Sequence, residues 1–227
     1  GDTAVRGAQA AGLNYQKAAV KSQIWAYQFF DFAKLAYADA EYNQTAATRP
    51  TPILAAQIMG EWGDGSNLLQ RYSSGKAHSR AIGFKAGLGC ADANATIAYN
   101  YITRERYAFN QGGLVAPYTA NYVSDPLYTT SMINGLVEKT PGHALKLSTT
   151  INWWAKQLIT TLSYAHYYTK PLTPNNTSES DFDVTYQFLH QKWWHGLSLR
   201  NRLGFLTGDA TYHHLAYERF IVQYTFG

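Results

Sequence analysis

Apolar and polar residues alternate along the stretch GLSLRNRLGFL, residues 196 to 206. Its odd-numbered positions are mostly leucine or phenylalanine, whereas Arg200 and Arg202 occupy even-numbered positions. Successive side chains of a β-strand point to opposite faces of the sheet. The segment therefore predicts a strand with one apolar face and one charged face.

The same alternation recurs along much of the chain. Between Leu145 and Trp153, for example, mostly apolar residues alternate with lysine, serine, threonine and asparagine. Such patterns of period two predict strands, and no segment favours a long helix. The four segments nearest the N-terminus are weaker and rich in alanine. We predict eleven strands, at about residues 4–14, 19–29, 32–43, 52–62, 80–90, 95–103, 145–153, 158–164, 182–188, 197–205 and 219–226.

The expected connections alternate between short and long. Short turns are predicted at residues 91–94, around Trp154 and at residues 191–196, and longer loops at residues 63–79, 104–142 and 169–180. Aromatic pairs fall at strand ends, at Trp153–Trp154, Trp193–Trp194 and Tyr167–Tyr168. Short turns on one side, long loops on the other and aromatic girdles are typical of outer-membrane β-barrels.

The composition favours a bilayer over water as the surroundings of the apolar face. Hydrophobic residues make up 46% of the chain, but charged residues only 15%, against about 25% in ordinary soluble domains. No apolar run is long enough for a transmembrane helix, and in lipid only a closed sheet pairs every backbone group. We therefore predict an all-β fold, an antiparallel transmembrane β-barrel over residues 1–227. A soluble barrel, with its apolar residues inside, is the alternative.

In such a barrel the polar face lines the lumen. One consistent alternation places five basic and three acidic residues there: Arg200, Arg202, Arg219, Lys146 and Lys85, and Asp39, Glu41 and Asp183. Basic and acidic groups separated across a lumen would orient an anionic or dipolar solute and speed its entry. Alternatively, these charges pair across neighbouring strands and only keep the lumen open.

Other classes of function find little support in the sequence. The net charge of +4 comes from scattered residues, so we expect no nucleic acid partner. Cys90 is the single cysteine, and the adjacent His213 and His214 would point apart on a strand, so we expect neither metal nor cofactor. No catalytic constellation is evident, and we expect a channel, not an enzyme. A structural or adhesive barrel and, less favoured, a barrel enzyme remain alternatives.

The C-terminal sequence resembles a known family. SDFDVTYQFLHQKWWHGLSLRNRLGFLTGD and YERFIVQYTF are similar to the last strands of the OprD family of outer-membrane porins. Upstream, VKSQIWAYQFFDFAKLAYADAEYNQ and HALKLSTTINWW fit the second half of that family. The resemblance implies an 18-stranded monomeric channel in the bacterial outer membrane. It also implies a ladder of basic residues in the lumen and uptake of small carboxylate-bearing solutes.

The resemblance also suggests roles for single residues. Arg200, Arg202 and Arg219 would belong to the ladder, and Ser131 would lie at the constriction. Asn134, in the same loop, stands where channels for basic amino acids would have a tyrosine. The loop is 39 residues long and rich in aromatic residues, so we expect it to fold against or into the barrel.

Length and strand number predict a larger barrel. An 18-stranded member needs about 400 residues, whereas this chain has 227. Eleven strands would also put the two termini on opposite sides of the membrane, unlike bacterial barrels. We expect the C-terminal part of a larger barrel, completed by missing N-terminal strands or by a second chain, with outer-membrane lipid or lipopolysaccharide around it. A ten-stranded barrel, without a strand in residues 1–16, is the alternative.

Overall fold

A computed structural model gives the fold. It describes residues 7–44, 48–66, 68, 75–115, 126–136, 141–169, 175–189, 193–208 and 214–225. The regular elements are β1 (Ala8–Lys17), β2 (Val20–Phe29), β3 (Ala33–Asn43), β4 (Thr51–Gly63), β5 (His78–Gly89), β6 (Ala93–Ile102), a short 3-10 turn η2 (Phe109–Gly112), β7 (Gly142–Trp153), β8 (Leu158–Thr169), β9 (Asn175–Gln187), β10 (Leu197–Thr207) and β11 (His214–Tyr224).

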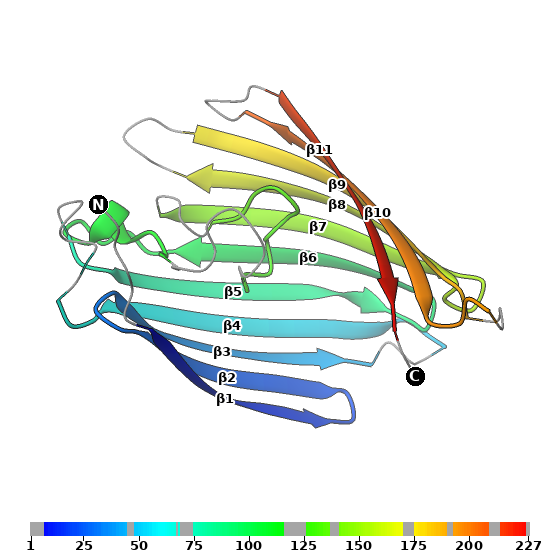
Figure 1. Ribbon diagram of the computed structural model, residues 1–227, viewed down its shortest axis with the longest axis horizontal. Helices are drawn as coiled ribbons and strands as arrows, with labels where there is room; N and C mark the ends of the chain where they lie inside the picture. The colour runs from blue at the N-terminus through cyan, green and yellow to red at the C-terminus, as the bar shows by residue number, and fades with distance from the viewer. Residues whose placement is uncertain are drawn as a thin grey trace.

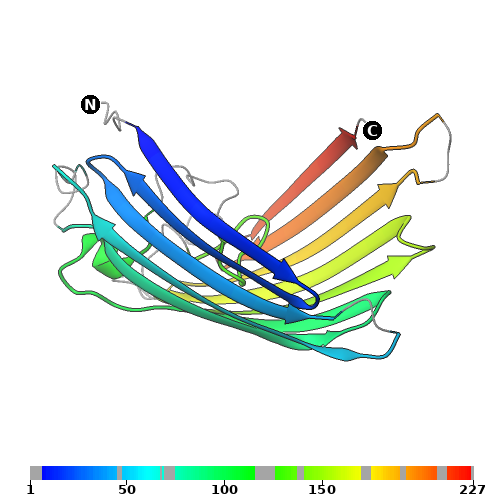
Figure 2. The same cartoon turned by 90° about the horizontal axis from the view of Figure 1, so that it is seen from below.

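The eleven strands form one sheet in the order of the sequence, each antiparallel to the next (Figure 1). The sheet curves into an open trough, with β1 and β11 at its two edges (Figure 2). No ladder joins these edge strands within the described part of the chain. The all-β antiparallel fold is therefore confirmed, and the sheet has the form of part of a barrel wall.

The convex face is apolar, as the alternation predicts. Phe205, Val222 and Tyr224 are 51%, 60% and 49% exposed there, and Leu13 and Ile24 are more exposed still. On the concave face, by contrast, apolar side chains are covered, because leucines from the long β6–β7 connection pack against Tyr37, Met59 and their neighbours. An apolar outer surface fits a bilayer and contradicts the soluble-barrel alternative. No helix among the described residues is long and apolar enough to cross a bilayer.

Several boundaries differ from the prediction; β8, for example, extends to Thr169 and β11 begins at His214. β1 is shifted toward the C-terminus, to Ala8–Lys17. The long loop expected at residues 169–180 is wrong, because β9 already begins at Asn175. The first half of β9 is polar on both faces, so it shows no alternation, yet it pairs along its length with β8 and β10.

One aromatic pair was also misread. Trp153, Trp154, Trp193 and Trp194 are exposed beside the short turns. Tyr168 is 41% exposed on the convex face, but the adjacent Tyr167 is fully buried on the concave face. Neighbouring residues of a strand face opposite ways, so only one of the two can join an aromatic girdle.

Candidate functional site: the concave face

Part of the long β6–β7 connection lies on the concave face (Figure 1). We call residues 126–136 the inner loop segment. Its Thr129 and Leu136 are fully buried, and Asn134 is 6% exposed. Tyr167 on β8 fastens it by donating from Oη to two backbone carbonyls, Thr129 O at 2.8 Å and Asn134 O at 3.1 Å.

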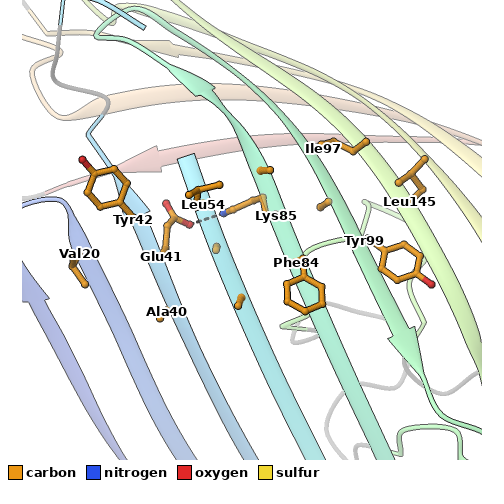
Figure 3. Close-up of a pocket in the computed structure, with 14 residues that line it drawn as sticks. Val20, Ala40, Glu41, Tyr42, Leu54, Phe84, Lys85, Ile97, Tyr99 and Leu145 are labelled. Carbon is orange, nitrogen blue, oxygen red and sulfur yellow. Dashed lines mark hydrogen bonds and ion pairs between the residues drawn. The ribbon is translucent and has the colours of Figure 1, made fainter. Parts of the chain in front are cut away.

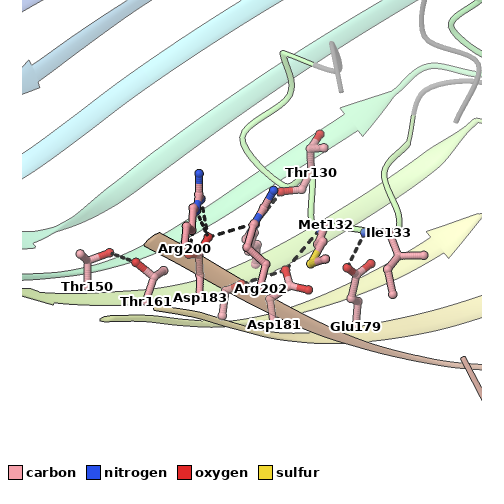
Figure 4. A network of polar contacts seen from close by, with 12 residues as sticks. Thr130, Met132, Ile133, Thr150, Thr161, Glu179, Asp181, Asp183, Arg200 and Arg202 are labelled. Carbon is pink, nitrogen blue, oxygen red and sulfur yellow. Dashed lines mark hydrogen bonds and ion pairs between the residues drawn. The ribbon is translucent and has the colours of Figure 1, made fainter. Parts of the chain in front are cut away.

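β9 holds the inner loop segment with acidic side chains. Glu179 Oε1 accepts the N–H of Ile133 at 2.7 Å, and Asp181 Oδ2 accepts that of Met132 at 3.4 Å (Figure 4). Both carboxylates are buried, at 1% and 8% exposed. Within the described residues, one oxygen of each, Glu179 Oε2 and Asp181 Oδ1, has no hydrogen-bond partner. These side chains thus pair backbone donors that would otherwise be orphaned inside the trough.

The N-terminal part of the same connection is held from β4 and β5. The fully buried Glu61 accepts the Val115 N–H at Oε2, at 2.9 Å. Ser79 Oγ donates to Gly113 O at 2.7 Å. Carboxylates on opposite sides of the trough therefore hold the two ends of the connection, Glu61 at one and Glu179 with Asp181 at the other.

The predicted constriction residues lie in the inner loop segment. The N–H of Ser131 donates to Asn134 O at 2.9 Å, which closes a tight turn. Asn134 Nδ2 in turn donates to Thr177 Oγ1 on β9 at 2.7 Å. Ser131 Oγ is buried and makes no hydrogen bond to the described part of the protein.

Arg200 and Arg202 share a single carboxylate. Arg200 Nε lies 2.8 Å and 3.0 Å from the two oxygens of Asp183, and Arg200 Nη2 also bonds Asp183 Oδ2 (Figure 4). Arg202 Nε lies 3.0 Å from the same Oδ2. Asp183 stands directly opposite Arg202 in the β9–β10 ladder, which explains why it reaches both guanidinium groups.

Arg219 continues this basic group onto β11. It stands directly opposite Arg202 in the β10–β11 ladder, so both side chains share the concave face. Its guanidinium carbon lies 5.6 Å from the ring centre of Tyr217, a cation–π contact. We call Arg200, Arg202 and Arg219 the arginine group.

The predicted lysines make local contacts. Lys85 Nζ lies 2.5 Å from Glu41 Oε2 and 4.9 Å from the ring centre of Tyr128, in the inner loop segment. Lys146 Nζ donates to Thr130 O at 2.5 Å. Burial and the nearby carboxylates raise the pKa of Tyr128, so this phenol stays neutral. Both lysines thus support the inner loop segment.

The expected separation of acidic from basic groups is wrong for Asp183 and Glu41. Asp183 pairs with Arg200 and Arg202, and Glu41 with Lys85. The third predicted acid, Asp39, accepts hydrogen bonds from Gln23 at 3.0 Å and Tyr37 at 2.7 Å. Cross-strand register decides these pairings, and alternation along a single strand does not reveal register.

The convex face offers a different kind of hollow. A groove of about 660 Å³ is lined by apolar side chains such as Leu54, Phe84, Tyr99 and Leu145 (Figure 3). The Glu41–Lys85 ion pair in the same view belongs to the other face of the sheet. An apolar groove on this face offers no anchor for a charged solute, so the candidate site is confined to the concave face.

Sequence reasoning missed the three acids that hold the long connection. Glu179 was assigned to a loop, Asp181 lay between that loop and the next predicted strand, and Glu61 was passed over. One signal was available, because Glu179, Asp181 and Asp183 alternate and so share one face of a strand. Among the described residues, no group of three His, Cys, Asp or Glu side chains is placed to hold a metal ion.

The chain was compared with known proteins. No family model matches the sequence. No curated protein matches it either. Among solved structures it is similar to Pseudomonas aeruginosa OccK9 (OpdG), with a TM-score of 0.71 and 14% identity over 96% of this chain and 53% of that chain. Acinetobacter baumannii OccAB3 gives a TM-score of 0.72 and 14% identity over 96% and 54%.

A third similar structure is Pseudomonas aeruginosa OpdK with vanillate, with a TM-score of 0.68 and 13% identity over 96% and 55%. These structures are of OprD-family porins. The chain spans a little over half of their length. At this level of identity the similarity establishes the fold: the chain folds like part of the barrel of these porins.

Proposed function

We propose that the chain forms one side of an outer-membrane channel through which small carboxylate-bearing solutes diffuse. The observation that carries the proposal is the arginine group on the concave face of β10 and β11. A guanidinium offers several donors in a plane, which match a carboxylate. The similar OpdK structure contains vanillate, a carboxylate anion. We extend that class of solute, and not that particular compound, to this chain.

In this proposal the inner loop segment narrows the channel. Side chains from β8 and β9 hold it against the concave face, and Ser131 and Asn134 form its turn. Lys146 and Lys85 contribute positive charge beside it. A solute that passes this segment would next meet the arginine group. Several weak contacts in series suit transport, since a solute must leave as readily as it binds.

The proposal includes the surroundings of the chain. Its apolar convex face would contact outer-membrane lipid or lipopolysaccharide. The open trough and the coverage of little more than half of the similar barrels favour further strands between β1 and β11. These strands would come from an N-terminal part of the same protein or from a second chain.

Planar-bilayer recording of the full-length protein tests the function. We expect Arg200→Ala with Arg202→Ala to shift the reversal potential toward cations and to slow carboxylate uptake. Each lost contact is worth about 1 kcal/mol, or about fivefold, in a water-filled pore. Uptake of neutral sugars should barely change. Arg80→Ala is the matched control, because Arg80 pairs with Gly60 on the convex face of β4 and β5.

Two results would contradict this function. An equal loss for sugars and carboxylates would mean that the arginines only hold the pore open. Absence of any ionic conductance in the wild-type protein would favour a structural or adhesive barrel.

A further inference from the structure

A charged side chain, Glu218, lies in the apolar band of the convex face. Leu162, Phe182, Leu203 and Glu218 stand directly opposite one another on β8 to β11, so they form one row across this face. Glu218 is exposed on the convex face, as Leu162 and Phe182 are. A carboxylate therefore takes a position that hydrophobic side chains hold along the rest of the row.

The depth of Glu218 makes this position unfavourable for a lone charge. On the same face of β11, Phe220, Val222 and Tyr224 follow it toward the short-turn end. For a strand tilted by about 45°, Tyr224 lies about 15 Å from Glu218 along the bilayer normal. The apolar band of such a barrel is about 25 Å tall, so Glu218 lies near its middle. Lipid offers the carboxylate no hydrogen-bond donor there, and an unpaired charge is costly.

Asn201 pairs only one oxygen of this carboxylate. Its Nδ2, on β10, donates to Glu218 Oε1 at 2.7 Å. Among the residues that the structure describes, none bonds Glu218 Oε2 and none forms an ion pair with Glu218. The nearest cations along these two strands, Arg202 and Arg219, face the concave side. The charge of Glu218 is therefore not balanced within the described part of the chain.

β11 is an edge strand, so a partner can lie on its free side. A strand added there would place one side chain on the convex face directly beside Glu218, with about 4.5–5.5 Å between the two Cα atoms. A side chain in that place can reach Oε2 while Asn201 keeps Oε1. The unbalanced carboxylate thus points to a cation on the added strand.

A second copy of this chain does not fit beside β11. The two edge strands, β1 and β11, run in the same direction (Figure 2). Either edge strand of a second copy in the same membrane orientation would therefore run parallel to β11, whereas every ladder between the strands of this sheet is antiparallel. β1 also offers Leu13 near its middle on the convex face, and not a cation.

We propose that the strand that completes the barrel beside β11 carries an arginine or a lysine that pairs with Glu218 on the lipid-facing surface. The proposal rests on the further strands that the proposed function includes, and it specifies the strand that closes the barrel. This strand belongs to a segment other than a copy of this chain and runs antiparallel to β11. The ion pair would also fix the register of closure, because a slip by one residue turns the cation to the lumen.

Urea midpoints of the full-length protein in lipid vesicles test the pair. Glu218→Leu should lower the midpoint by about 1 M, because it leaves the cation unpaired in the apolar band. Ala216→Leu is the matched control, since it places the same side chain two residues away on the same face of β11. It should leave the midpoint unchanged or raise it. An unchanged or raised midpoint in Glu218→Leu would mean that the carboxylate has no cationic partner, and the proposal would fail.

An exchange of charges keeps the test decisive if Glu218→Leu does not fold. The strand register identifies the residue of the full-length protein that faces Glu218. Glu218→Arg alone should reduce the yield of folded barrel by about tenfold or more, because two cations then meet in lipid. Glu218→Arg combined with glutamate at the facing position should restore at least about half of the yield. The absence of arginine and lysine at the facing position, or a failure of the exchange to restore folding, would overturn the proposal.

These outcomes are distinct from those of the channel function. Carboxylate selectivity depends on the arginine group of the concave face, whereas Glu218 lies on the convex face. Wild-type protein without carboxylate selectivity would refute the proposed function and leave the urea midpoints as expected. Equal midpoints of the wild-type protein and Glu218→Leu would refute the ion pair and leave the selectivity as expected.

Discussion

Two neighbouring parts of the concave face, one covered by the inner loop segment and one uncovered, use acidic side chains in opposite ways. Under the inner loop segment, Glu179 and Asp181 are buried and accept backbone N–H groups. Two residues further along the same strand, Asp183 instead pairs with Arg200 and Arg202, whose side chains are 43% and 26% exposed. The comparison teaches that the same carboxyl group is buried and structural where a loop covers the strand, and stays partly exposed beside basic groups where no loop covers it.

The largest effect is expected on the covered side. Glu179→Leu leaves the Ile133 N–H without its acceptor inside the trough, at a cost of about 1–3 kcal/mol to loop docking. Limited proteolysis of the long connection should then accelerate by about fivefold or more, and single-channel conductance should rise. Glu179→Gln, which retains an acceptor oxygen, is the control and should behave closer to wild type. Equal cleavage rates in all three proteins would show that the carboxyl group does not hold the loop.

A smaller effect is expected on the uncovered side. Asp183→Asn removes the shared counter-ion of Arg200 and Arg202, so the channel should favour anions more strongly. The change is about 1 kcal/mol, or about fivefold in the anion-to-cation permeability ratio. Reversal potentials in a potassium chloride gradient measure it.

The control for this effect is Asp39→Asn, which removes the same charge from the concave face of β3 away from the arginine group. Because screening limits interactions to about 10 Å at 0.1 M salt, its shift should be smaller. If Asp183→Asn and Asp39→Asn shifted the reversal potential equally, the anion-to-cation permeability ratio would follow net charge alone.

The smallest effect concerns the outer rim of the trough. A hydrogen bond from Gln28 and the ion pair with Lys34, each 3.0 Å long, lower the pKa of Asp64. A carboxyl group whose pKa is lower in the folded state stabilises the fold above its unfolded pKa, near 3.9, and loses this contribution as the pH falls through the folded value. We expect less than about 1 kcal/mol.

Urea midpoints at pH 6 and at pH 3 measure this contribution. Asp64→Asn should remove the corresponding part of the pH dependence and leave the rest. If the urea midpoints of the wild-type protein and the variant fell by the same amount between pH 6 and pH 3, the Asp64 contacts would contribute nothing to stability.

The fold was predictable from sequence to the extent that one face is apolar. β10, for example, alternates over most of its length and was predicted with the faces of its leucines and arginines correct. The start of β9 was missed because Ser178, Glu179, Ser180 and Asp181 are polar on both faces, so no period of two is visible. Only pairing with β8 and β10 makes this segment a strand.

The candidate site was predictable by face but not by partner. Alternation correctly grouped Asp183 with Arg200 and Arg202 on the concave face. We expected the acid to stand apart from the two arginines, but it pairs with both. Their contact depends on the register of β9 against β10, which the connection between the strands sets. Likewise, the length and aromatic content of residues 104–142 predicted an inward fold but not the side chains that hold it.

The anchoring of the inner loop segment also constrains the order of assembly. Tyr128 Oη donates to Ala56 O, 72 residues earlier in the chain, and the Ile133 N–H donates to Glu179, 46 residues later. Contacts of such long sequence separation form only after the intervening chain has been ordered, because loop closure is entropically unfavourable. The contacts of the loop with β9 can therefore form only once β9 has paired, whereas its contacts with Tyr167 on β8 and with β4 do not depend on β9.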